Sequence, residues 1–310
     1  MKWQQALHIL RQATIGRGES TATLRRETRW QPPEMRRPST GPLRASAARP
    51  HSICVASGKG GTGKSVLTAS LAHLLGRRGR TLLIDADLGV GNAHLLQGVS
   101  PEHTLVDVVE GRARPRQVVE SCGGMVDLLA GGSGVAHMAE LSGPELEHLA
   151  LGLEELENDY RWTLVDSAAG VSSQTLAFAV SADLVLLVTT PDLTAMTDAY
   201  AFLKALTRLS PRGRLALVVN RAQGRAEAEA VAERICAVAQ RFLHSAPSVL
   251  GWLPDDRAVR RAVNARAPVV KAEPKSAWSR AAEGLAVDLL EELACTHPRG
   301  LGDSLVRSLA

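Results

Sequence analysis

Residues 52–78 read SICVASGKGGTGKSVLTASLAHLLGRR and join three patterns within one short stretch. The first six residues form an apolar run with the length and composition of a buried β-strand. From Lys64 onward, apolar residues recur at helical spacing. Between these two patterns, residues 58–65 match G-x-x-x-x-G-K-[ST] in the strand-to-helix context that the motif requires. The stretch therefore predicts a phosphate-binding loop between the first strand and the first helix of a domain.

The glycines of this loop indicate how it would hold phosphate. Glycine lets successive backbone N–H groups point into the loop, and the N-terminus of the next helix adds positive potential. We expect Lys64 to reach the β- and γ-phosphates and the Ser65 hydroxyl to coordinate Mg²⁺, so the predicted cofactors are ATP and Mg²⁺. The residues expected to contact the nucleotide here are Gly58, Lys59, Gly60, Gly61, Thr62, Gly63, Lys64 and Ser65.

Short apolar runs alternate with helical stretches along the rest of the chain. Strands are expected at residues 52–57, 81–84, 125–130, 162–165, 184–189, 215–220 and 248–252. Helices are expected at residues 64–75, 144–156, 172–180, 192–209, 225–243 and 275–295. Apolar strands separated by helices are typical of a mostly parallel sheet that is covered on both faces. We therefore expect an α/β fold with a doubly wound sheet, in one domain spanning residues 51–296.

The basic residues of the chain are unevenly distributed. Residues 1–50 hold 10 Lys/Arg and 3 Asp/Glu, whereas the whole chain of 310 residues holds 36 and 32. Residues 16–50 are rich in Arg, Pro, Ser, Thr and Gly, a composition that buries too little apolar surface to offset ordering entropy. This stretch is predicted to be a basic disordered linker.

A different pattern precedes the linker. Trp3, Leu7 and Leu10 fall at helical spacing within residues 1–15. They predict a short amphipathic helix that forms when it docks on a partner surface.

Cysteine usage and hydropathy exclude several classes of protein. The four cysteines have no C-x-x-C spacing, which argues against a zinc site or a disulfide framework, and we expect ordinary core thiols. The chain has no apolar run of ~18 residues and no apolar segment of a secretion signal at its N-terminus. We therefore expect a cytoplasmic protein. The cysteines are Cys54, Cys122, Cys236 and Cys295.

Three carboxylates follow two of the predicted strands. The second strand ends in LLIDADLGVGN, which contains Asp85 and Asp87, and the strand WTLVDSAAG contains Asp166. Ligands of open α/β sheets bind at the carboxyl ends of the strands, and strand alternation would turn Asp85 and Asp87 to the same side. Clustered carboxylates are costly unless a cation balances them. We therefore expect the three carboxylates to face a cation, which Mg²⁺-ATP would supply.

The loop resembles a particular class of phosphate-binding loop. KGGTGKS matches K-G-G-x-G-K-[ST], the deviant Walker A signature of the MinD/ParA family of P-loop ATPases. The resemblance implies that Lys59 crosses a dimer interface to the nucleotide of the partner subunit, and hence an ATP-dependent homodimer. It also implies that Asp87 orients or activates the attacking water, that Asp85 supports the magnesium shell, and that Asp166 with Gly170 forms the Walker B and switch II region.

The same family resemblance extends to the base of the nucleotide. The strand LALVVNRA ends in Asn220 and Arg221, and the last strand is followed by GWLPDDRAVRRAV. By resemblance, Asn220, Arg221, Pro254 and Asp255 are expected to contact the adenine.

Further stretches are similar to one group in the family, the FlhG/FleN regulators of flagellar number and placement. They are DADLGVGNAHLLQGV, TLVDVVEGR, LVDSAAGVSSQTLAFAVSADLVLLVTTPDLTAMTDAYAFLKAL and GWLPDDRAVRRAVNARAPVV. The resemblance covers most of residues 52–290 and implies a switch that dimerises on ATP. No arginine finger is evident, so we expect slow ATP hydrolysis.

The terminal segments bear on the partners of the protein. FlhG proteins often begin with D-Q-A-x-x-L-R, which stimulates the GTPase FlhF; this chain has QQALHILR, with Gln4 in place of the acid and one extra residue. Residues 297–310 end in GLGDSLVRSLA, with Leu301, Leu305, Val306 and Leu309 on one stripe. By resemblance, this tail is an amphipathic membrane-targeting segment, which would act best in two copies because one is too weak to anchor.

Two alternatives belong to other classes. A ParA-like partitioning ATPase would bind DNA nonspecifically through basic residues. A plain nucleotide-binding scaffold would not hydrolyse ATP, but Asp87 and Asp166 favour hydrolysis. We expect DNA to be a less favoured partner than flagellar proteins or membrane. The N-terminal tail would add to the basic residues available for DNA, which are Arg257, Arg260, Arg261 and Arg266.

Overall fold

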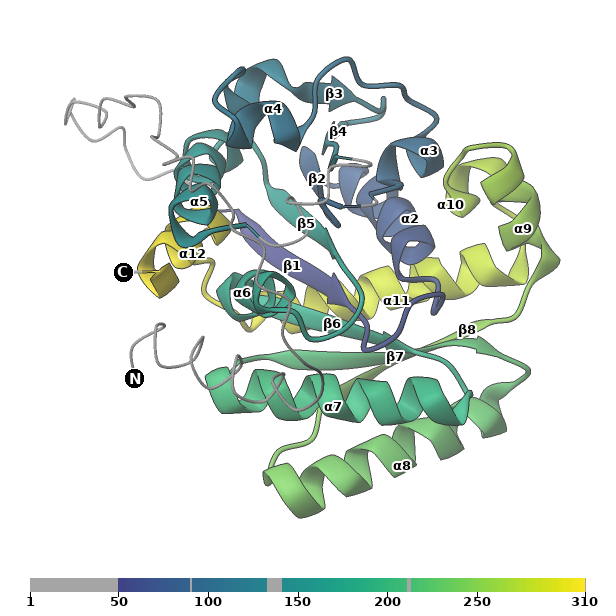
Figure 1. Ribbon diagram of the computed structural model, residues 1–310. Coiled ribbons are helices and arrows are strands. Elements are labelled where there is room, and N and C mark those ends of the chain that lie inside the picture. Colours follow the sequence, from purple (N-terminus) through teal and green to yellow (C-terminus); the bar gives the residue numbers. More distant parts are fainter. Residues whose placement is uncertain (1–49, 90, 133–140, 211–212, 310) are drawn as a thin grey trace, which may run out of the picture.

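A computed structural model gives the structure of the protein, and it describes residues 50–89, 91–132, 141–210 and 213–309 (Figure 1). The helix predicted in residues 1–15 lies outside the described residues, as does the linker predicted over residues 16–50 except for Pro50.

The described chain forms one sheet of eight strands in the order β3-β4-β2-β5-β1-β6-β7-β8. The seven strands from β4 to β8 in that order pair in parallel, and β3 pairs antiparallel with β4. This confirms the predicted doubly wound α/β fold, in which all seven expected strands are present and β3 is additional. The strands are β1 (His51–Ala56), β2 (Thr81–Ala86), β3 (Val119–Ser121), β4 (Val126–Leu129), β5 (Trp162–Ser167), β6 (Leu184–Thr189), β7 (Leu215–Ala222) and β8 (Ser248–Pro254).

Helices cover both faces of the sheet (Figure 1). Successive residues of β1 show the division, since Ile53 and Val55 belong to one buried apolar cluster, and Cys54 and Ala56 to the other. The first cluster includes residues of α2 (Lys64–Gly76), α3 (Ala93–Gln97), α9 (Arg257–Asn264), α10 (Val269–Ala272) and α11 (Ala277–Ala294). The second includes residues of α4 (Leu105–Val109), α5 (Gly143–Glu157), α6 (Ser173–Ser181), α7 (Leu193–Leu209), α8 (Arg225–Leu243) and α12 (Leu301–Leu309). A short 3₁₀ helix, η1 (Pro115–Gln117), contacts α5.

The C-terminal tail differs from its prediction. Residues 301–309 form α12, which packs against α5 and α6, so the domain continues past residue 296. Leu301 and Leu305 are fully buried, and Val306 and Leu309 pack against the same core. The apolar stripe that we expected to meet a membrane is therefore covered by the domain itself, because α5 and α6 offer it an apolar surface.

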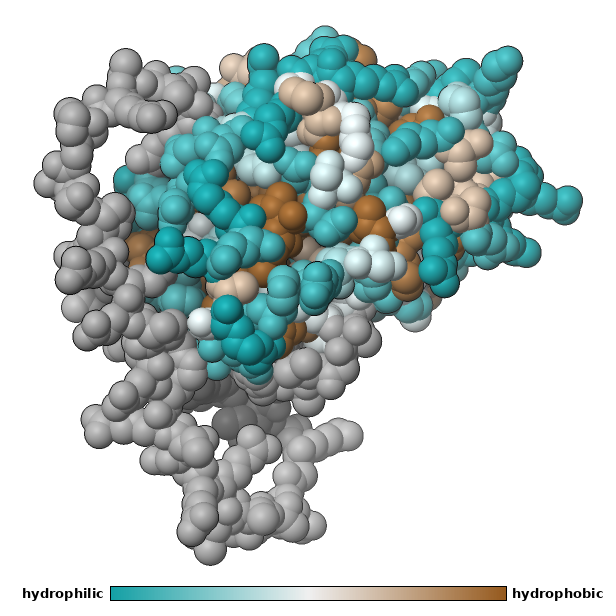
Figure 2. All heavy atoms as spheres, turned by 90° about the horizontal axis from the view of Figure 1, so that it is seen from above, coloured by the Kyte–Doolittle hydropathy of each residue, from teal (hydrophilic) through white to brown (hydrophobic). Residues whose placement is uncertain are grey.

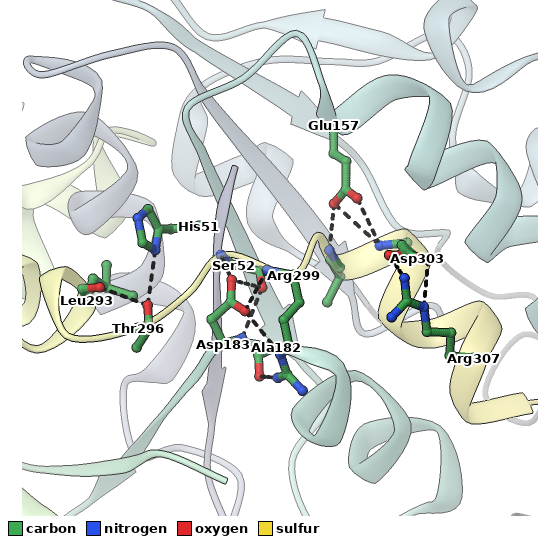
Figure 3. Close-up of polar contacts among 12 residues, drawn as sticks. His51, Ser52, Glu157, Ala182, Asp183, Leu293, Thr296, Arg299, Asp303 and Arg307 are labelled. Carbon is green, nitrogen blue, oxygen red and sulfur yellow. Dashed lines mark hydrogen bonds and ion pairs between the residues drawn. The ribbon is translucent and has the colours of Figure 1, made fainter. Parts of the chain in front are cut away.

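Buried carboxylates accept hydrogen bonds from this tail and so hold it against the domain (Figure 3). Glu157 at the end of α5 accepts the backbone N–H of Leu301 at 2.7 Å and that of Gly302 at 3.3 Å. Asp183 accepts the backbone N–H and the hydroxyl of Ser52 on β1, and it also accepts the backbone N–H and the Nε–H of Arg299. The tail is thus hydrogen-bonded at the N-terminus of α12 and in the segment that leads to it.

Exposed apolar side chains are dispersed on the face nearest α4 and β3. Figure 2 shows hydrophobic residues there in small patches among hydrophilic ones. None of the helices in the described ranges combines the length and the apolar character that crossing a membrane requires.

Cys54 and Cys122 are buried, as expected for core thiols, but Cys236 is only half-buried and Cys295 is exposed.

Candidate nucleotide site

The predicted phosphate-binding loop lies between β1 and α2, as its sequence pattern required. Gly63 precedes α2 with a φ of 85°, a conformation that glycine adopts without strain. A Cβ atom at Gly63 would lie 2.3 Å from Nδ2 of Asn220, and one at Gly58 would lie 2.1 Å from the carbonyl oxygen of Asp198 in α7. Glycine is thus required at both positions because the loop lies directly against β7 and α7.

Lys64 and Asp166 form a buried ion pair at the edge of the sheet. The Nζ atom of Lys64 lies 2.6 Å from Oδ1 of Asp166 and 3.5 Å from Oγ of Ser65. Thr68, one helical turn after Lys64, also donates its hydroxyl to Asp166 at 3.4 Å. The structure thus brings Lys64, Ser65 and Asp166 together, and it adds Thr68, whose i+4 spacing from Lys64 was the available signal.

Asp85 lies beside Asp166 on the neighbouring strand, where the two are register partners. Asp85 is fully buried and accepts the backbone N–H groups of Asp87 at 3.2 Å and Ala93 at 2.9 Å. Burial, and secondarily the negative charge of Asp166, raises the pKa of Asp85 to about 7. Two buried carboxylates on adjacent strands, of which Asp166 is paired with Lys64, make this edge of the sheet attractive to a cation.

Asp87 lies in the loop after β2, because the strand ends at Ala86. The strand alternation that we invoked to orient Asp85 and Asp87 together therefore does not apply to Asp87. Instead, Asp85 holds the backbone of the loop at both ends through Asp87 and Ala93, and Asp87 itself is half-buried.

The second lysine of the loop lies in a different environment. Lys59 is exposed, and its Nζ donates to Oγ1 of Thr194 at 2.6 Å, near the start of α7. Sequence reasoning missed Thr194, since no local pattern links it to the loop. On the other side of the loop, the backbone N–H of Gly170 donates to the carbonyl of Ser57 at 2.9 Å, which joins the segment after β5 to the loop.

The residues predicted to contact adenine do come together, around a cavity of about 540 Å³ beside the loop. Asn220 donates its Nδ2–H to the carbonyl of Thr62 at 2.7 Å, and this fixes the orientation of its amide. Arg221 has a φ of 59°, an uncommon conformation for a residue other than glycine. The lining residues are Gly61, Gly63, Val66, Asn220, Arg221, Gln223, Pro254, Asp255, Asp256, Arg257, Val259, Arg260 and Trp278.

These residues fit ATP and Mg²⁺. The buried Oδ1 of Asn220 has no hydrogen-bond partner in the described structure, and it would accept a hydrogen bond from the amino group of adenine. Ser65, Asp85 and Asp166 offer the oxygen ligands that Mg²⁺ prefers. The described residues contain no convergent group of three His, Cys, Asp or Glu, and Mg²⁺ commonly binds through one or two carboxylates plus nucleotide phosphates.

Comparisons with known proteins agree with this geometry. The family model of the CobQ/CobB/MinD/ParA nucleotide binding domain matches residues 53–269. Antiactivator FleN of Pseudomonas aeruginosa is 34% identical over 249 residues, which cover 80% of this chain and 89% of FleN. Flagellum site-determining protein YlxH of Helicobacter pylori is 31% identical over 252 residues, covering 80% of this chain and 85% of YlxH.

Solved structures show the same fold. The septum site-determining protein MinD of Pyrococcus horikoshii, complexed with Mg-ADP, superposes with a TM-score of 0.66 and 26% identity over 79% of this chain and 97% of MinD. The chain therefore belongs to the CobQ/CobB/MinD/ParA nucleotide-binding family, and it is an ATPase of the MinD/ParA type that uses ATP and Mg²⁺.

Proposed function

We propose that this protein is a slow ATPase switch that dimerises on ATP and regulates the number or placement of flagella. The similarity to the antiactivator FleN and to the flagellum site-determining protein YlxH, over four fifths of the chain, supports the flagellar role. The observation that supports the switch is the different environment of the two lysines in the phosphate-binding loop. Lys64 is buried in the site, whereas Lys59 is exposed at its rim.

The site residues would divide the chemistry as follows. Backbone N–H groups of the loop and Lys64 would hold the phosphates, while Ser65 and Asp166 would hold Mg²⁺, which would neutralise charge on the phosphates when bound. Asp85 supports this arrangement and fixes the loop that carries Asp87. Asp87 orients the attacking water.

The base would lie in the cavity formed by the ends of β7 and β8. Asn220, Arg221, Pro254 and Asp255 line that cavity and would contact the adenine.

A second copy of the chain is the proposed partner at the rim. Near Lys59, at the carboxyl edge of the sheet, Leu193 is 75% exposed and Val171 is 43% exposed. Packing against a second copy would remove these apolar side chains from water, which is favourable. In the dimer, Lys59 would leave Thr194 and reach the nucleotide of the partner.

Further partners are a FlhF-like flagellar GTPase, or another flagellar or transcription regulator, and the membrane surface. The proposed location is the cytoplasm, with peripheral attachment to the inner face of the membrane. Attachment through α12 would require that helix to leave α5 and α6, because its apolar stripe is covered.

DNA partitioning is the second candidate function. Arg257, Arg260 and Arg261 on α9 are exposed and form a basic surface beside the base cavity. Part of this charge is balanced, since Arg261 pairs with Glu273 at 2.6 Å. This balance favours the flagellar function.

Sedimentation velocity of the Asp87→Ala variant distinguishes these functions. The variant is run with ATP and with ADP, then again with liposomes and with DNA. An ATP-specific dimer that gains liposome binding supports the flagellar switch, whereas a dimer that binds DNA supports partitioning. If ATP changes neither the mass nor the partner, the switch proposal fails.

A further inference from the structure

An apolar groove of about 510 Å³ lies between α8 and β8, at the edge of the sheet opposite to β3. We refer to it as the α8–β8 groove. It exists because α8 packs mainly on α7 and β7, while β8 is the edge strand beyond β7. The residues lining the groove are Arg225, Ala228, Glu229, Ala232, Glu233, Cys236, Val249, Gly251 and Trp252.

The walls of this groove are apolar and incompletely covered. Val249 is 49% exposed although it pairs with Leu217, a fully buried residue of β7. Trp252 is half-buried and packs against the apolar cluster that contains Ala228 and Ala232. Because the small alanine side chains of α8 and the missing side chain of Gly251 leave space between the helix and the strand, the groove has room for larger apolar side chains from outside.

The rim of the groove on the α8 side is acidic. Glu229 and Glu233 are both exposed there, one helical turn apart. Arg225 pairs with Glu229 at 2.7 Å, whereas Glu233 forms no ion pair with the residues that the structure describes. An occupant with an apolar stripe and neighbouring positive charge would match both the walls and the rim.

We propose that residues 2–14 of the same chain bind in the α8–β8 groove as an amphipathic helix. Trp3, Leu7 and Leu10 have the i, i+4, i+7 spacing of helix-in-groove recognition. Lys2 and Arg11 flank this stripe, and the first acidic residue of the chain is Glu19. The segment therefore supplies apolar anchors and a purely positive charge, which complement the groove.

The length of the intervening chain permits this contact. β1 and β8 are separated by three strand steps, which at ~4.8 Å each place them about 15 Å apart across the sheet. A flexible chain of the length of residues 16–49 has a root-mean-square span of roughly 30 Å. Because that span covers the separation, the tether would present the segment to the groove at an effective concentration on the order of millimolar.

Docking would withhold the segment from other proteins. The stripe of Trp3, Leu7 and Leu10 that contacts the groove is the same surface that an external partner would use. The groove thus acts as an intramolecular competitor for the N-terminal segment, and this holds whether or not the proposed flagellar role is correct.

Cys236 lines the groove and provides a direct test in the full-length chain. The Leu7→Cys variant is treated with diamide, which oxidises two thiols to a disulfide, and the product is mapped by proteolysis and mass spectrometry. The matched control is Gln5→Cys, because position 5 lies on the opposite face of the predicted helix. Linkage of position 7 to Cys236 within one chain should be at least ~10-fold faster than linkage of position 5. Cys236→Ser should abolish it.

Charge reversal tests the rim separately. Glu233→Lys should slow the position 7 linkage roughly two- to fivefold, whereas Glu291→Lys, an exposed change on α11, should leave it unaltered. Equal linkage rates for positions 5 and 7 would mean that the tethered segment meets Cys236 only by random collision, and this would overturn the proposal. Linkage only between different chains would overturn it equally, since the occupant would then be a second copy.

Discussion

The Nζ atom of Lys64 and the Oδ1 atom of Asp166 lie 2.6 Å apart, and both side chains are almost completely buried. This pair neutralises the lysine that the site would offer to phosphate. On the neighbouring strand, burial and, secondarily, the charge of Asp166 raise the pKa of Asp85. We therefore expect these three residues to affect both the stability of the sheet edge and its affinity for nucleotide.

Lys64→Ala should abolish ATP binding and destabilise the protein. Removing one partner of a buried ion pair leaves an uncompensated charge, at a cost of about 3 kcal/mol. Isothermal titration with Mg-ATP and urea unfolding measure the two effects. Arg77→Ala is the control, because its pair with Glu283 is exposed and its loss should cost less than about 1 kcal/mol. ATP binding of normal affinity by Lys64→Ala would contradict the assigned site.

Asp87→Ala should keep ATP-dependent dimerisation but stop hydrolysis. Asp87 follows β2 at the edge of the site, and the change removes the proposed water-orienting carboxylate without touching the Lys64–Asp166 pair. Phosphate release and sedimentation velocity report the two properties. The exposed Asp288→Ala on α11 should alter neither. Normal turnover in Asp87→Ala would refute the proposed mechanism.

Lys59→Ala should bind ATP yet remain monomeric, since Lys59 is proposed to act on the nucleotide of the partner. The hydrogen bond to Thr194 provides the control. Thr194→Val frees Lys59 from a neutral, exposed contact, so the dissociation constant of the ATP dimer should stay the same or fall by up to about fivefold. A fully dimeric Lys59→Ala protein would exclude the trans role.

Asn220→Ala should weaken ATP binding by roughly 10- to 100-fold and reduce the preference for ATP over GTP. Donation of Nδ2–H to the carbonyl of Thr62 leaves Oδ1 to accept from the amino group of adenine, which guanine lacks at that ring position. Asn220→Asp keeps an acceptor but loses the donor to Thr62, so it serves as the comparison. Competition binding with ATP and GTP gives both values, and an unchanged ratio in Asn220→Ala would assign selectivity elsewhere.

Much of the fold follows from local sequence, because the long apolar runs and the glycine loop carry strong periodicity. The predicted helix 225–243 matches α8, and the strand 184–189 matches β6. β3 has three residues and little burial, so its pairing with β4 leaves no readable pattern. Residues 297–310 were expected to be an amphipathic membrane-targeting tail, because an amphipathic stripe does not reveal which apolar surface will cover it.

The candidate site likewise contains residues that the sequence predicts and residues that it does not. Lys64, Ser65 and Asp166 follow from motifs whose spacing fixes their place at the sheet edge. Thr194 reaches Lys59 from another element 135 positions away, a contact that depends on how α7 packs beside the loop. Such long-range contacts leave no signal in a single sequence.

Glu157 should make the stability of the protein depend on pH. Burial raises the pKa of this carboxyl from 4.5 to about 7, even though the backbone N–H groups of Leu301 and Gly302 oppose the shift. The folded state therefore holds the proton more tightly than the unfolded state, so the contribution of Glu157 to stability is greatest at low pH. That contribution falls as the pH rises from about 4.5 to about 7, by at most about 3 kcal/mol.

Glu157→Gln should remove this dependence while keeping an oxygen that accepts the N–H groups of α12. Urea unfolding of both proteins at pH 5 and pH 8 gives the difference attributable to Glu157. Comparing the two proteins isolates the effect of Glu157, because Asp85, whose pKa is also raised, contributes in the same direction to the stability of both. The variant should gain stability relative to the wild type between the two pH values. If the two proteins instead change in parallel, Glu157 does not titrate in this range, and the carboxylate at the N-terminus of α12 is charged throughout.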